Sequence, residues 1–569
     1  MSSIHVADDD VADKIVGVMW NTGSDSPALQ QIDVDGDVIT KKSTAWFDRH
    51  PVWGGTKRCI LSVDGVPIFG ADAKGSDLAL DGSAGPVMVS RPAFYVKAEK
   101  SGDYLKYWIS PSAYPGYVKH PWFFQRGGIE RGVGYVGAYM AALRHTAAGA
   151  LRLHSATGKQ PVSGQEIVEL SFTGGSVLPV EGDFITGETS LVRGTVISVY
   201  KASGDWATLN AAGKILLKMV DELVGFDTGS VAPTIGQTLT CGTATGELVN
   251  IILSSGTWGG GNAAGYFVIR GGNGTVFPVS TNITDPLGGL AKTVSTASQA
   301  SGEVKASFTN PENLKISGAT VAVSADIGTI LPLTRQLAET YGNNVGSLRW
   351  GIEDIWGIDA TTMMYLIEYC DWRSQSTTYG IGSGVSSKPA ARRFAGENTG
   401  SGSSDSNIAA NGTGRAIGTD GQVHVVYRGM EDPWGNLYRF AIGIDILDAN
   451  YRLLKPTGTG LPACPLTADN YIETVNAPYT YDVSLRPDGY WKYPVFEEAT
   501  RFLFLPAMTG GSNDTYSCDW ASLHRSGQTN IMLVGGYWYD GAKCGVGCRG
   551  ATNVASSSSR YCGCRAEFL

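Results

Sequence analysis

The sequence contains no long hydrophobic run. No apolar stretch approaches the roughly 18 residues that a membrane-spanning helix needs, so we expect no membrane insertion. The N-terminal stretch MSSIHVADDDVADKIVG is polar and acidic. It lacks the basic segment followed by an apolar segment that marks a secretory signal. We therefore expect the chain to be made and folded in a cytoplasm, or to leave it by an unusual route.

Charge is scarce, and basic charge is in the minority. Only 17% of the residues are charged, and 44 Lys and Arg stand against 53 Asp and Glu, which gives a net charge of −9. Proteins that bind nucleic acids or anionic membranes in general need a basic surface. The composition therefore argues against nucleic acid and against a membrane surface as partners.

Common catalytic motifs are also missing. The sequence contains no G-x-x-x-x-G-K-[ST], no H-E-x-x-H and no G-x-S-x-G. Its 7 histidines are dispersed along the chain, and an isolated histidine is more often structural than catalytic. We predict that the protein is not an enzyme, holds no metal ion and uses no cofactor.

Glycine, by contrast, is abundant. The 569 residues include 75 glycines, well above the usual share of ~7%. With many serines, threonines, tyrosines and tryptophans, this composition favours turn-rich β structure over a helical bundle. A chain of this length is also too long for one compact core. We predict a mainly β, multidomain protein.

An internal repeat lies in the Gly- and Thr-rich region of residues 166–325. SGDWATLNAAGKILLK (203–218) and SGTWGGGNAAGYFVIR (255–270) share the pattern W-x3-NAAG-x4-[KR] at an offset of 52 residues. A tryptophan and a four-residue identity at one spacing indicate a duplicated unit. Two units are too few for a solenoid, so we predict two tandem small β modules, each forming its own barrel or sandwich.

Two segments carry helical patterns. LPLTRQLAETYGNN (331–344) is typical of a helix, and DATTMMYLIEYCDWRSQS (359–376) is the stronger of the two. In the second segment Asp359 can cap the N-terminus. Apolar residues at i, i+3, i+4 and i+7 share one helical face: Met363, Leu366, Ile367 and Cys370. We predict an amphipathic helix that packs one face on a core.

The segment YRGMEDPWGNLYRFAIGID (427–445) resembles the PWGN segment of C-type-lectin-like domains of the formylglycine-generating-enzyme superfamily. It is similar in particular to bacteriophage and prophage structural proteins that carry this domain at their C-terminus. Further stretches resemble those phage proteins in the same order: GYVKHPWF (116–123), GAYMAALR (137–144), LRLHSATGKQPV (151–162), MYLIEYCDWRSQS (364–376) and the C-terminal VGGYWYDGAKCGVGCRGATNVASSSSRYCGCRAEF.

The resemblance covers about 85–165 and 330–569, so the repeat modules look inserted between its two halves. It implies a virion fibre, tail-tip or head-decorating protein, most often a homotrimer, that contacts other virion proteins and is assembled in the host cytoplasm. The implied function is binding of a host cell-surface glycan or protein through the lectin-type fold. Within that fold Trp434 is expected to anchor the core and Asn436 to brace the backbone.

We accordingly divide the chain into four regions. Residues 1–90 are expected to form an N-terminal β region for attachment or trimerisation, and residues 91–165 the first part of the lectin-like portion. Residues 166–325 contain the repeat modules. Residues 326–569 are expected to form a C-terminal α+β C-type-lectin-like domain.

Two other functions remain open. A purely structural capsid- or tail-decorating protein without a ligand would have the same sequence features. An enzyme of the formylglycine-generating type would need a copper-binding thiol pair, which cannot be placed on this chain. A stable trimer without metal would favour the fibre, and a monomer with bound copper or zinc would favour the enzyme.

The last four of the nine cysteines lie close together. They form a C-x3-C and a C-x-C pair separated by 13 residues: Cys544, Cys548, Cys562 and Cys564. Disulfide bonds, a zinc site and free thiols all remain open, although zinc ribbons prefer C-x2-C pairs and the sequence cannot choose among the disulfide pairings. We interpret the other five as small buried hydrophobic residues: Cys59, Cys241, Cys370, Cys464 and Cys518.

Three consecutive aromatic residues precede these cysteines. On a strand, Trp538 would face the core, while Tyr537 and Tyr539 would share the exposed face. Tyrosine suits recognition because it offers a large rigid surface and a polar tip. We predict a glycan-binding face, with a merely solvated loop as the alternative, made of Tyr537, Tyr539, Asp540, Lys543, Arg549, Asn553, Ser557, Arg560 and Tyr561.

Overall fold

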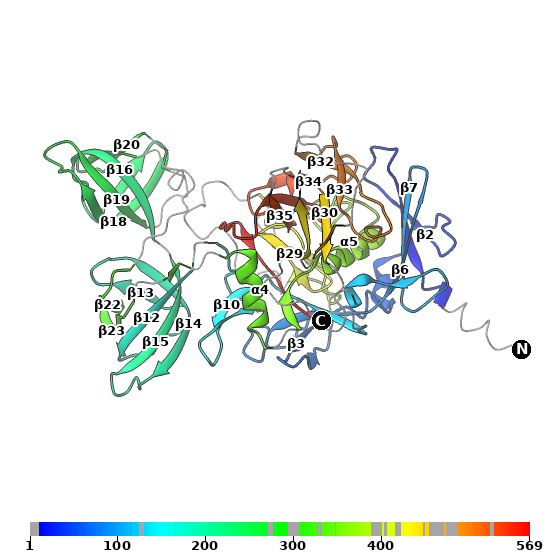
Figure 1. Ribbon diagram of the computed structural model, residues 1–569, viewed down its shortest axis with the longest axis horizontal. Coiled ribbons are helices and arrows are strands. Elements are labelled where there is room, and N and C mark those ends of the chain that lie inside the picture. The colour runs from blue at the N-terminus through cyan, green and yellow to red at the C-terminus, as the bar shows by residue number, and fades with distance from the viewer. Residues whose placement is uncertain are drawn as a thin grey trace, which may run out of the picture.

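The structure is a computed structural model that describes residues 11–124, 130–164, 167–219, 221–270, 277–278, 280–293, 308–326, 329–330, 333–346, 349–387, 401–402, 407–415, 421, 423–447, 450–454, 471–473, 488–523 and 528–569. It is mainly β with several sheets, which confirms the predicted fold class. Figure 1 shows a large body around one long helix, with two small β units beside it. The body contains both the N-terminal and the C-terminal described segments.

The body has three large sheets. A five-stranded sheet has the order β2 (Gln30–Ile32), β1 (Val16–Asn21), β7 (Tyr104–Ser110), β6 (Tyr95–Ser101), β8 (Val118–Lys119). A six-stranded sheet has the order β25 (Trp350–Ile352), β38 (Ala566–Phe568), β9 (Val133–Gly137), β5 (Val87–Pro92), β3 (Lys57–Leu61), β4 (Pro67–Phe69). The third sheet contains β31 (Tyr471–Glu473), β30 (Asn450–Leu454), β29 (Tyr438–Leu447), β35 (Thr529–Val534), β36 (Arg549–Asn553), β34 (Trp520–Leu523), β32 (Gly489–Pro494), β33 (Pro506–Thr509) and, paired with β29, β37 (Cys562–Gly563).

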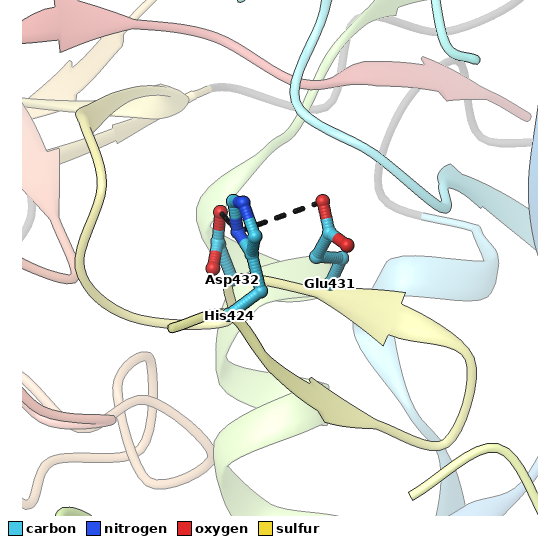
Figure 2. A group of neighbouring side chains, drawn as sticks. All are labelled: His424, Glu431 and Asp432. Atoms are coloured by element: carbon cyan, nitrogen blue, oxygen red, sulfur yellow. Dashed lines mark hydrogen bonds and ion pairs between the residues drawn. The ribbon is translucent and has the colours of Figure 1, made fainter. Parts of the chain in front are cut away.

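Smaller elements complete the body. They are the pair β10 (Ala142–His145) and β11 (Leu151–His154), the helices α2 (Thr44–Arg49) and α4 (Arg335–Asn343), and the 3-10 turns η1 (Pro121–Phe123) and η5 (Gly541–Lys543). A short three-stranded sheet contains β26 (Gly414–Arg415), β27 (Val425–Tyr427) and β28 (Met430–Glu431). Figure 2 shows the hairpin of β27 and β28 from close by. Helix α4 confirms the helix predicted over 331–344, with Thr334 as its N-cap.

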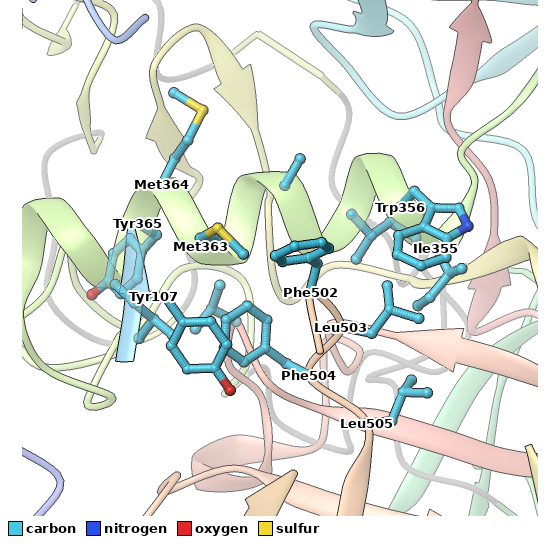
Figure 3. Close-up of a cluster of buried hydrophobic side chains, with 14 of the residues drawn as sticks. Tyr107, Ile355, Trp356, Met363, Met364, Tyr365, Phe502, Leu503, Phe504 and Leu505 are labelled. Carbon is cyan, nitrogen blue, oxygen red and sulfur yellow. The ribbon is translucent and has the colours of Figure 1, made fainter. Parts of the chain in front are cut away.

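Helix α5 (Ile355–Tyr369) forms the centre of the body. Every residue from Ile355 to Glu368 is buried, which is typical of a helix surrounded by other elements rather than lying on a surface. Figure 3 shows Met364 leaving the helix on the side opposite to Phe502 and Phe504. The predicted amphipathic pattern is therefore wrong in one respect, because the helix has no solvent face.

The start of α5 also differs from the expectation. Asp354, rather than Asp359, is the N-cap, and its carboxylate accepts a hydrogen bond of 2.8 Å from the backbone N–H of Gly357. Asp359 lies one turn inside the helix and is fully buried. The sequence pattern placed the start of this helix too far along the chain. Ile355 and Trp356, which follow Asp354, already belong to the same buried helix.

The N-terminal residues are part of the body and do not form a region of their own. Strand β5 pairs antiparallel with β9, and β9 pairs with β38 at the C-terminus of the chain. Strand β1 pairs with β7, and its Trp20 side chain packs 5.1 Å from Trp372 between ring centroids. The expected separation of residues 1–90 is therefore not seen in residues 11–90, because their strands complete sheets that later segments begin.

The first repeat unit is a closed barrel. Its strands have the order β15 (Ala211–Met219), β14 (Arg193–Ser203), β13 (Phe184–Gly187), β22 (Asn313–Ile316), β23 (Ala319–Ser324), β12 (Ile167–Gly175). Strand β12 also pairs with β15 and closes the ring. A further short strand, β24 (Thr329–Ile330), pairs antiparallel with β12. The second unit is a closed barrel in the order β16 (Asp221–Val231), β19 (Ala263–Arg270), β18 (Ala244–Ser255), β17 (Thr238–Cys241), β20 (Asn282–Thr284), β21 (Leu290–Thr293).

The two barrels are nested in the sequence and do not follow each other in tandem. The first four strands of each barrel correspond in order, and each ring is closed by a final hairpin. The closing hairpin of the first barrel, β22 and β23, comes only after the whole second barrel. The second barrel is thus inserted into the first, and the first into the body (Figure 1).

The repeated residues occupy equivalent places in both barrels. Trp206 stacks on Phe172 with 5.3 Å between ring centroids, and Trp258 stacks on Phe226 at 5.1 Å. The side-chain oxygen of Asn262 accepts a hydrogen bond of 2.9 Å from the backbone of Thr257 in the preceding turn. Asn210 makes the same kind of contact, at 2.7 Å, with Asp205. The W-x3-NAAG pattern therefore encodes a tryptophan-covered β-turn.

Candidate functional site

The segment after β35 is held by hydrogen bonds to two distant loops. The backbone N–H of Trp538 donates to the Asn436 carbonyl at 3.0 Å. The N–H of Gly541 donates to the Ser386 carbonyl at 2.6 Å, and the Gln375 amide donates to the Gly541 carbonyl at 3.1 Å. These contacts fix the turn at 537–544 against the residues that follow α5.

A cavity of about 600 Å³ lies between this turn and two loops. Its wall is made by three parts of the chain: the segment 372–387, the loop around Asn513 and Asp514, and the turn at Gly541 and Ala542. Serine, amide, carboxyl and aromatic side chains mix in this wall. Such a mixture can hydrogen-bond and stack on a ligand of moderate polarity.

Arg373 and Tyr379 contact each other in the cavity wall. The Arg373 guanidinium lies 3.7 Å from the centre of the Tyr379 ring. It also donates two hydrogen bonds to the Asp371 carboxylate, at 2.9 and 2.8 Å, and lies 3.5 Å from Asp514. The hydrogen bonds to Asp371 raise the pKa of Arg373. The side chain is therefore a fixed cation, with an exposed tyrosine ring stacked beneath it.

The floor of the cavity contains a buried carboxyl group. Asp519 is 2% exposed, and its Oδ2 accepts a hydrogen bond of 2.6 Å from the backbone N–H of Gly547. Burial raises the pKa of Asp519 well above its usual range. A polar carboxyl group therefore lies at the bottom of the cavity.

Three predicted ligand residues lie in the turn next to the cavity. Tyr539 is 46% exposed and is two residues from Gly541. Lys543 is exposed, and its ammonium lies 4.2 Å from the centre of the Trp520 ring. Asp540 is partly buried, and burial raises its pKa to about 6. These residues stay candidates for ligand contact.

The predicted alternation of the three aromatic residues does not apply, because they lie beyond the end of β35 in a turn. Trp538 is 2% exposed, which confirms it as a core residue. Tyr537 is partly buried and packs between Tyr438 and Tyr561, with centroid distances of 5.5 and 4.8 Å. Tyr537 and Tyr561 thus form an aromatic cluster with Tyr438, while Tyr539 points to solvent.

The two predicted arginines are buried. Arg549 is fully buried, forms an ion pair with Asp359, and donates hydrogen bonds to the carbonyls of Val546 and Cys548 at 3.1 and 3.0 Å. Arg560 is 6% exposed. Their expected place on an exposed binding face is wrong, because both side chains are buried, and Arg549 is paired with Asp359 of the distant helix α5.

The remaining predicted ligand residues lie near the end of β36. Asn553 and Ser557 are both partly exposed. The Ser557 hydroxyl accepts a hydrogen bond of 3.2 Å from the backbone of Val554, and the Asn553 side-chain oxygen accepts one of 2.8 Å from Thr552. They lie in a local turn, and no contact places them in the cavity wall.

The cysteines are free thiols among the residues that the structure describes. Four of them lie near the C-terminal end of the sequence and are buried: Cys544, Cys548, Cys562 and Cys564. Burial raises the pKa of each of these thiols, so they remain protonated. None of the four is joined in a disulfide bond in the structure, and among the described residues they do not form a group of potential metal ligands within reach of one ion. The buried state expected for Cys59, Cys241, Cys370 and Cys518 is confirmed, and Cys464 lies outside the described residues.

The scaffold residues of the PWGN segment are largely as expected. Trp434 is fully buried, and its indole N–H donates to the Gly382 carbonyl at 3.3 Å, so its role as core anchor is confirmed. Asn436 has a left-handed backbone with φ of 61°. Its side-chain amide donates to Asp432 at 2.9 Å, while its carbonyl receives the N–H of Trp538. It therefore joins the PWGN turn to the aromatic turn.

Sequence reasoning missed the cavity wall itself. Arg373, Tyr379, Asn513 and Asp514 carry no motif of their own. The available signal was the local composition of STTYGIGSG (376–384) and of TGGSNDT (509–515). Polar loops rich in Gly, Ser and Asn on a rigid scaffold often carry binding residues.

Among the described residues, no helix is long and apolar enough to cross a membrane. Neither a scan against protein-family models nor a search of the curated proteins finds a match to this sequence. The residues of the cavity and the resemblance of the PWGN and C-terminal segments are therefore the grounds for a functional assignment.

Proposed function

We propose that the protein is a bacteriophage virion fibre or tail-tip protein that binds a host-surface glycan in the cavity beside the 537–544 turn. The lectin-type fold and the virion origin rest on the six segments that resemble phage structural proteins. The binding role rests on one observation, the polar and aromatic cavity of about 600 Å³ at the C-terminal turn.

The size and lining of the cavity suit part of an oligosaccharide. Ligand pockets commonly enclose about 300 to 1,000 Å³. Sugar hydroxyl groups pair with amide and carboxyl groups such as those of Gln375, Asn513 and Asp514, all of which line the cavity. The apolar CH faces of a sugar stack on tyrosine rings, and Tyr379 of the cavity wall is 47% exposed, while Tyr539 in the neighbouring turn is 46% exposed.

The proposal also gives a role to the nested barrels. They project from the body (Figure 1) and would act as spacers or accessory binding units. After synthesis in the host cytoplasm, three copies of the chain would form a homotrimer. The trimer would then contact other virion proteins. Light scattering of the purified full chain should then give three times the monomer mass of 60.2 kDa.

Glycan binding is tested with the full chain on an array of defined bacterial surface oligosaccharides. A double variant, Tyr379→Ala with Asn513→Ala, removes one stacking ring and one amide from the cavity wall. Loss of two such contacts should lower the affinity roughly tenfold or more. The matched control is Tyr266→Ala, which removes an equally exposed tyrosine, 42% exposed, on the second barrel.

Binding that the cavity variant loses and the control keeps would support the proposal. Equal binding by both variants would place the ligand elsewhere. Absence of binding by the unchanged protein, together with a stable trimer, would leave a capsid- or tail-decorating role without a ligand.

A further inference from the structure

Three potential metal ligands meet in the interior of the body, outside the cavity. His424 comes directly before β27, Glu431 ends β28, and Asp432 follows it. The antiparallel hairpin brings the two ends together, and the Asp432 N–H donates to the Val425 carbonyl at 2.8 Å. Figure 2 shows the imidazole of His424 between the two carboxylates.

The distances within the group suit a common ion. One ligand atom from each of the three residues lies within 4.8 Å of the others. His424 Nδ1 is 2.7 Å from Asp432 Oδ2 and 3.7 Å from Glu431 Oε1. All three side chains are at most 1% exposed. An ion held here would be enclosed by protein.

The second observation is an unsatisfied oxygen. Asp432 Oδ2 accepts hydrogen bonds from Asn436 at 2.9 Å and from His424. Asp432 Oδ1 is buried and has no hydrogen-bond partner among the residues that the structure describes. Buried carboxylate oxygens are nearly always satisfied, so an exception indicates a missing partner, and an ion is one.

Two guanidinium groups of the described residues lie near the site and bind other acceptors. Arg439 donates to the carbonyls of Asp432 and Pro433 and to the Glu353 carboxylate. Arg565 donates to the carbonyls of Gly137, Glu431 and Asp432. Neither guanidinium hydrogen-bonds to the carboxylate of Glu431 or Asp432. Among the described residues, the Glu431 carboxylate accepts hydrogen bonds from the backbone N–H of Gly402, and the Asp432 carboxylate contacts the Asn436 amide and His424.

We propose that His424, Glu431 and Asp432 bind one divalent transition-metal ion, through the imidazole Nδ1 and a carboxylate oxygen of each acidic residue. One imidazole and two carboxylates form a mixed nitrogen and oxygen set, which suits Zn²⁺ or Mn²⁺ better than Ca²⁺. The competing arrangement is a protonated His424 in an ion pair with Asp432. The two arrangements differ in whether an ion is present.

The site has a structural purpose that does not depend on the glycan proposal. Asp432 holds Asn436, whose carbonyl receives the N–H of Trp538. An ion that fixes Asp432 would thus stiffen the PWGN turn and, through it, the aromatic turn beside the cavity. Removal of the ion should lower the thermal unfolding midpoint of the whole body.

The test measures metal content in the full chain purified without chelator. Mass spectrometry of the acid-digested protein should find about one Zn²⁺ or Mn²⁺ per chain. Dialysis against EDTA should lower the thermal midpoint, and one of the two ions should restore it. Co²⁺ added to the stripped protein should give visible d–d absorption, which reports an ordered ligand set independently of stability.

The variants Asp432→Asn and His424→Gln should lose both the bound ion and the Co²⁺ absorption. The matched control is Glu353→Gln, which removes a buried carboxylate that contacts Arg439 but lies outside the ligand set. It should lose stability and keep the ion. If the unchanged protein holds no stoichiometric ion and its midpoint does not respond to EDTA or to added Zn²⁺ and Mn²⁺, the proposal is wrong, whether or not the variants fold.

Discussion

Arg549 and Asp359 form an ion pair that is completely buried, although 190 residues separate them in the sequence. Asp359 lies in the middle of α5 and also accepts a hydrogen bond of 2.8 Å from the backbone N–H of Phe504. Burial raises the pKa of the Asp359 carboxyl, and the Arg549 charge opposes that rise. The pair joins the central helix to strand β36.

The first prediction concerns this pair. Arg549→Ala leaves a carboxylate buried without its counter-charge, so it should lower the free energy of unfolding by about 3–5 kcal/mol. Urea denaturation of both proteins measures the difference. The control is Arg501→Ala, which breaks a surface pair with the exposed Glu498 and should cost about 0–1 kcal/mol. Similar costs for the two variants would show that the Arg549 side chain is hydrated.

The second prediction concerns pH and Asp540. Its pKa is raised to about 6 by burial, so the folded chain binds this proton more tightly than the unfolded chain does. The free energy of unfolding should therefore fall as the pH rises from about 4 to about 6, and this contribution should be level above that range. Asp540→Asn removes the ionisation, so at pH 7.5 it should be more stable than the unchanged protein by about 2 kcal/mol.

Denaturation curves at pH 4, 6 and 7.5 check this prediction. The advantage of Asp540→Asn should shrink toward zero at pH 4, where both side chains are neutral. Asp514→Asn is the control, because the Asp514 side chain is 74% exposed. An advantage of Asp540→Asn that stays the same at pH 4 would point to hydrogen bonding instead of charge.

The third prediction tests the nesting of the barrels. Leu314 is fully buried in β22, in the core of the first barrel, although it follows the second barrel in the sequence. Leu314→Ala should lower the free energy of unfolding of the first barrel by about 2–5 kcal/mol. Hydrogen–deuterium exchange should then become faster in residues 167–219 and remain unchanged in residues 221–270.

The reverse variant completes that test. Leu239 is fully buried in β17 of the second barrel, and Leu239→Ala should accelerate exchange in residues 221–270. Faster exchange of the second barrel in the Leu314 variant, with the first barrel unchanged, would contradict the observed strand order.

The fourth prediction concerns the last strand. Phe568 in β38 is 1% exposed, and its ring lies 4.9 Å from Trp350 and 5.9 Å from Tyr135. Because β38 lies between β25 and β9, Phe568→Ala should lower the free energy of unfolding by about 3–5 kcal/mol. Calorimetry of the full chain measures the effect. A change below about 1 kcal/mol would mean that β38 is dispensable for the six-stranded sheet.

Local patterns in the sequence determined several features of this protein. The glycine-rich composition, the duplicated W-x3-NAAG unit and the helical spacing around Met363 predicted a mainly β chain with two small β modules, barrels or sandwiches, and a helix that packs on a core. The burial of Trp434 and Trp538 was also predicted, although Trp538 lies in a turn and not on the strand that its prediction assumed. These features depend on residues close together in the sequence, where turn chemistry and periodicity act directly.

Only the tertiary structure decided which polar residues are accessible and which strands complete which sheet. Arg549 was predicted to bind ligand, but the structure pairs it with the buried Asp359. No functional role was predicted for His424, which the hairpin places against Asp432. Likewise β22 carries no repeat signature, yet it closes the first barrel. The reason is physical: burial, ion pairing and strand pairing depend on partners that lie tens or hundreds of residues away, and a local pattern contains no information about them.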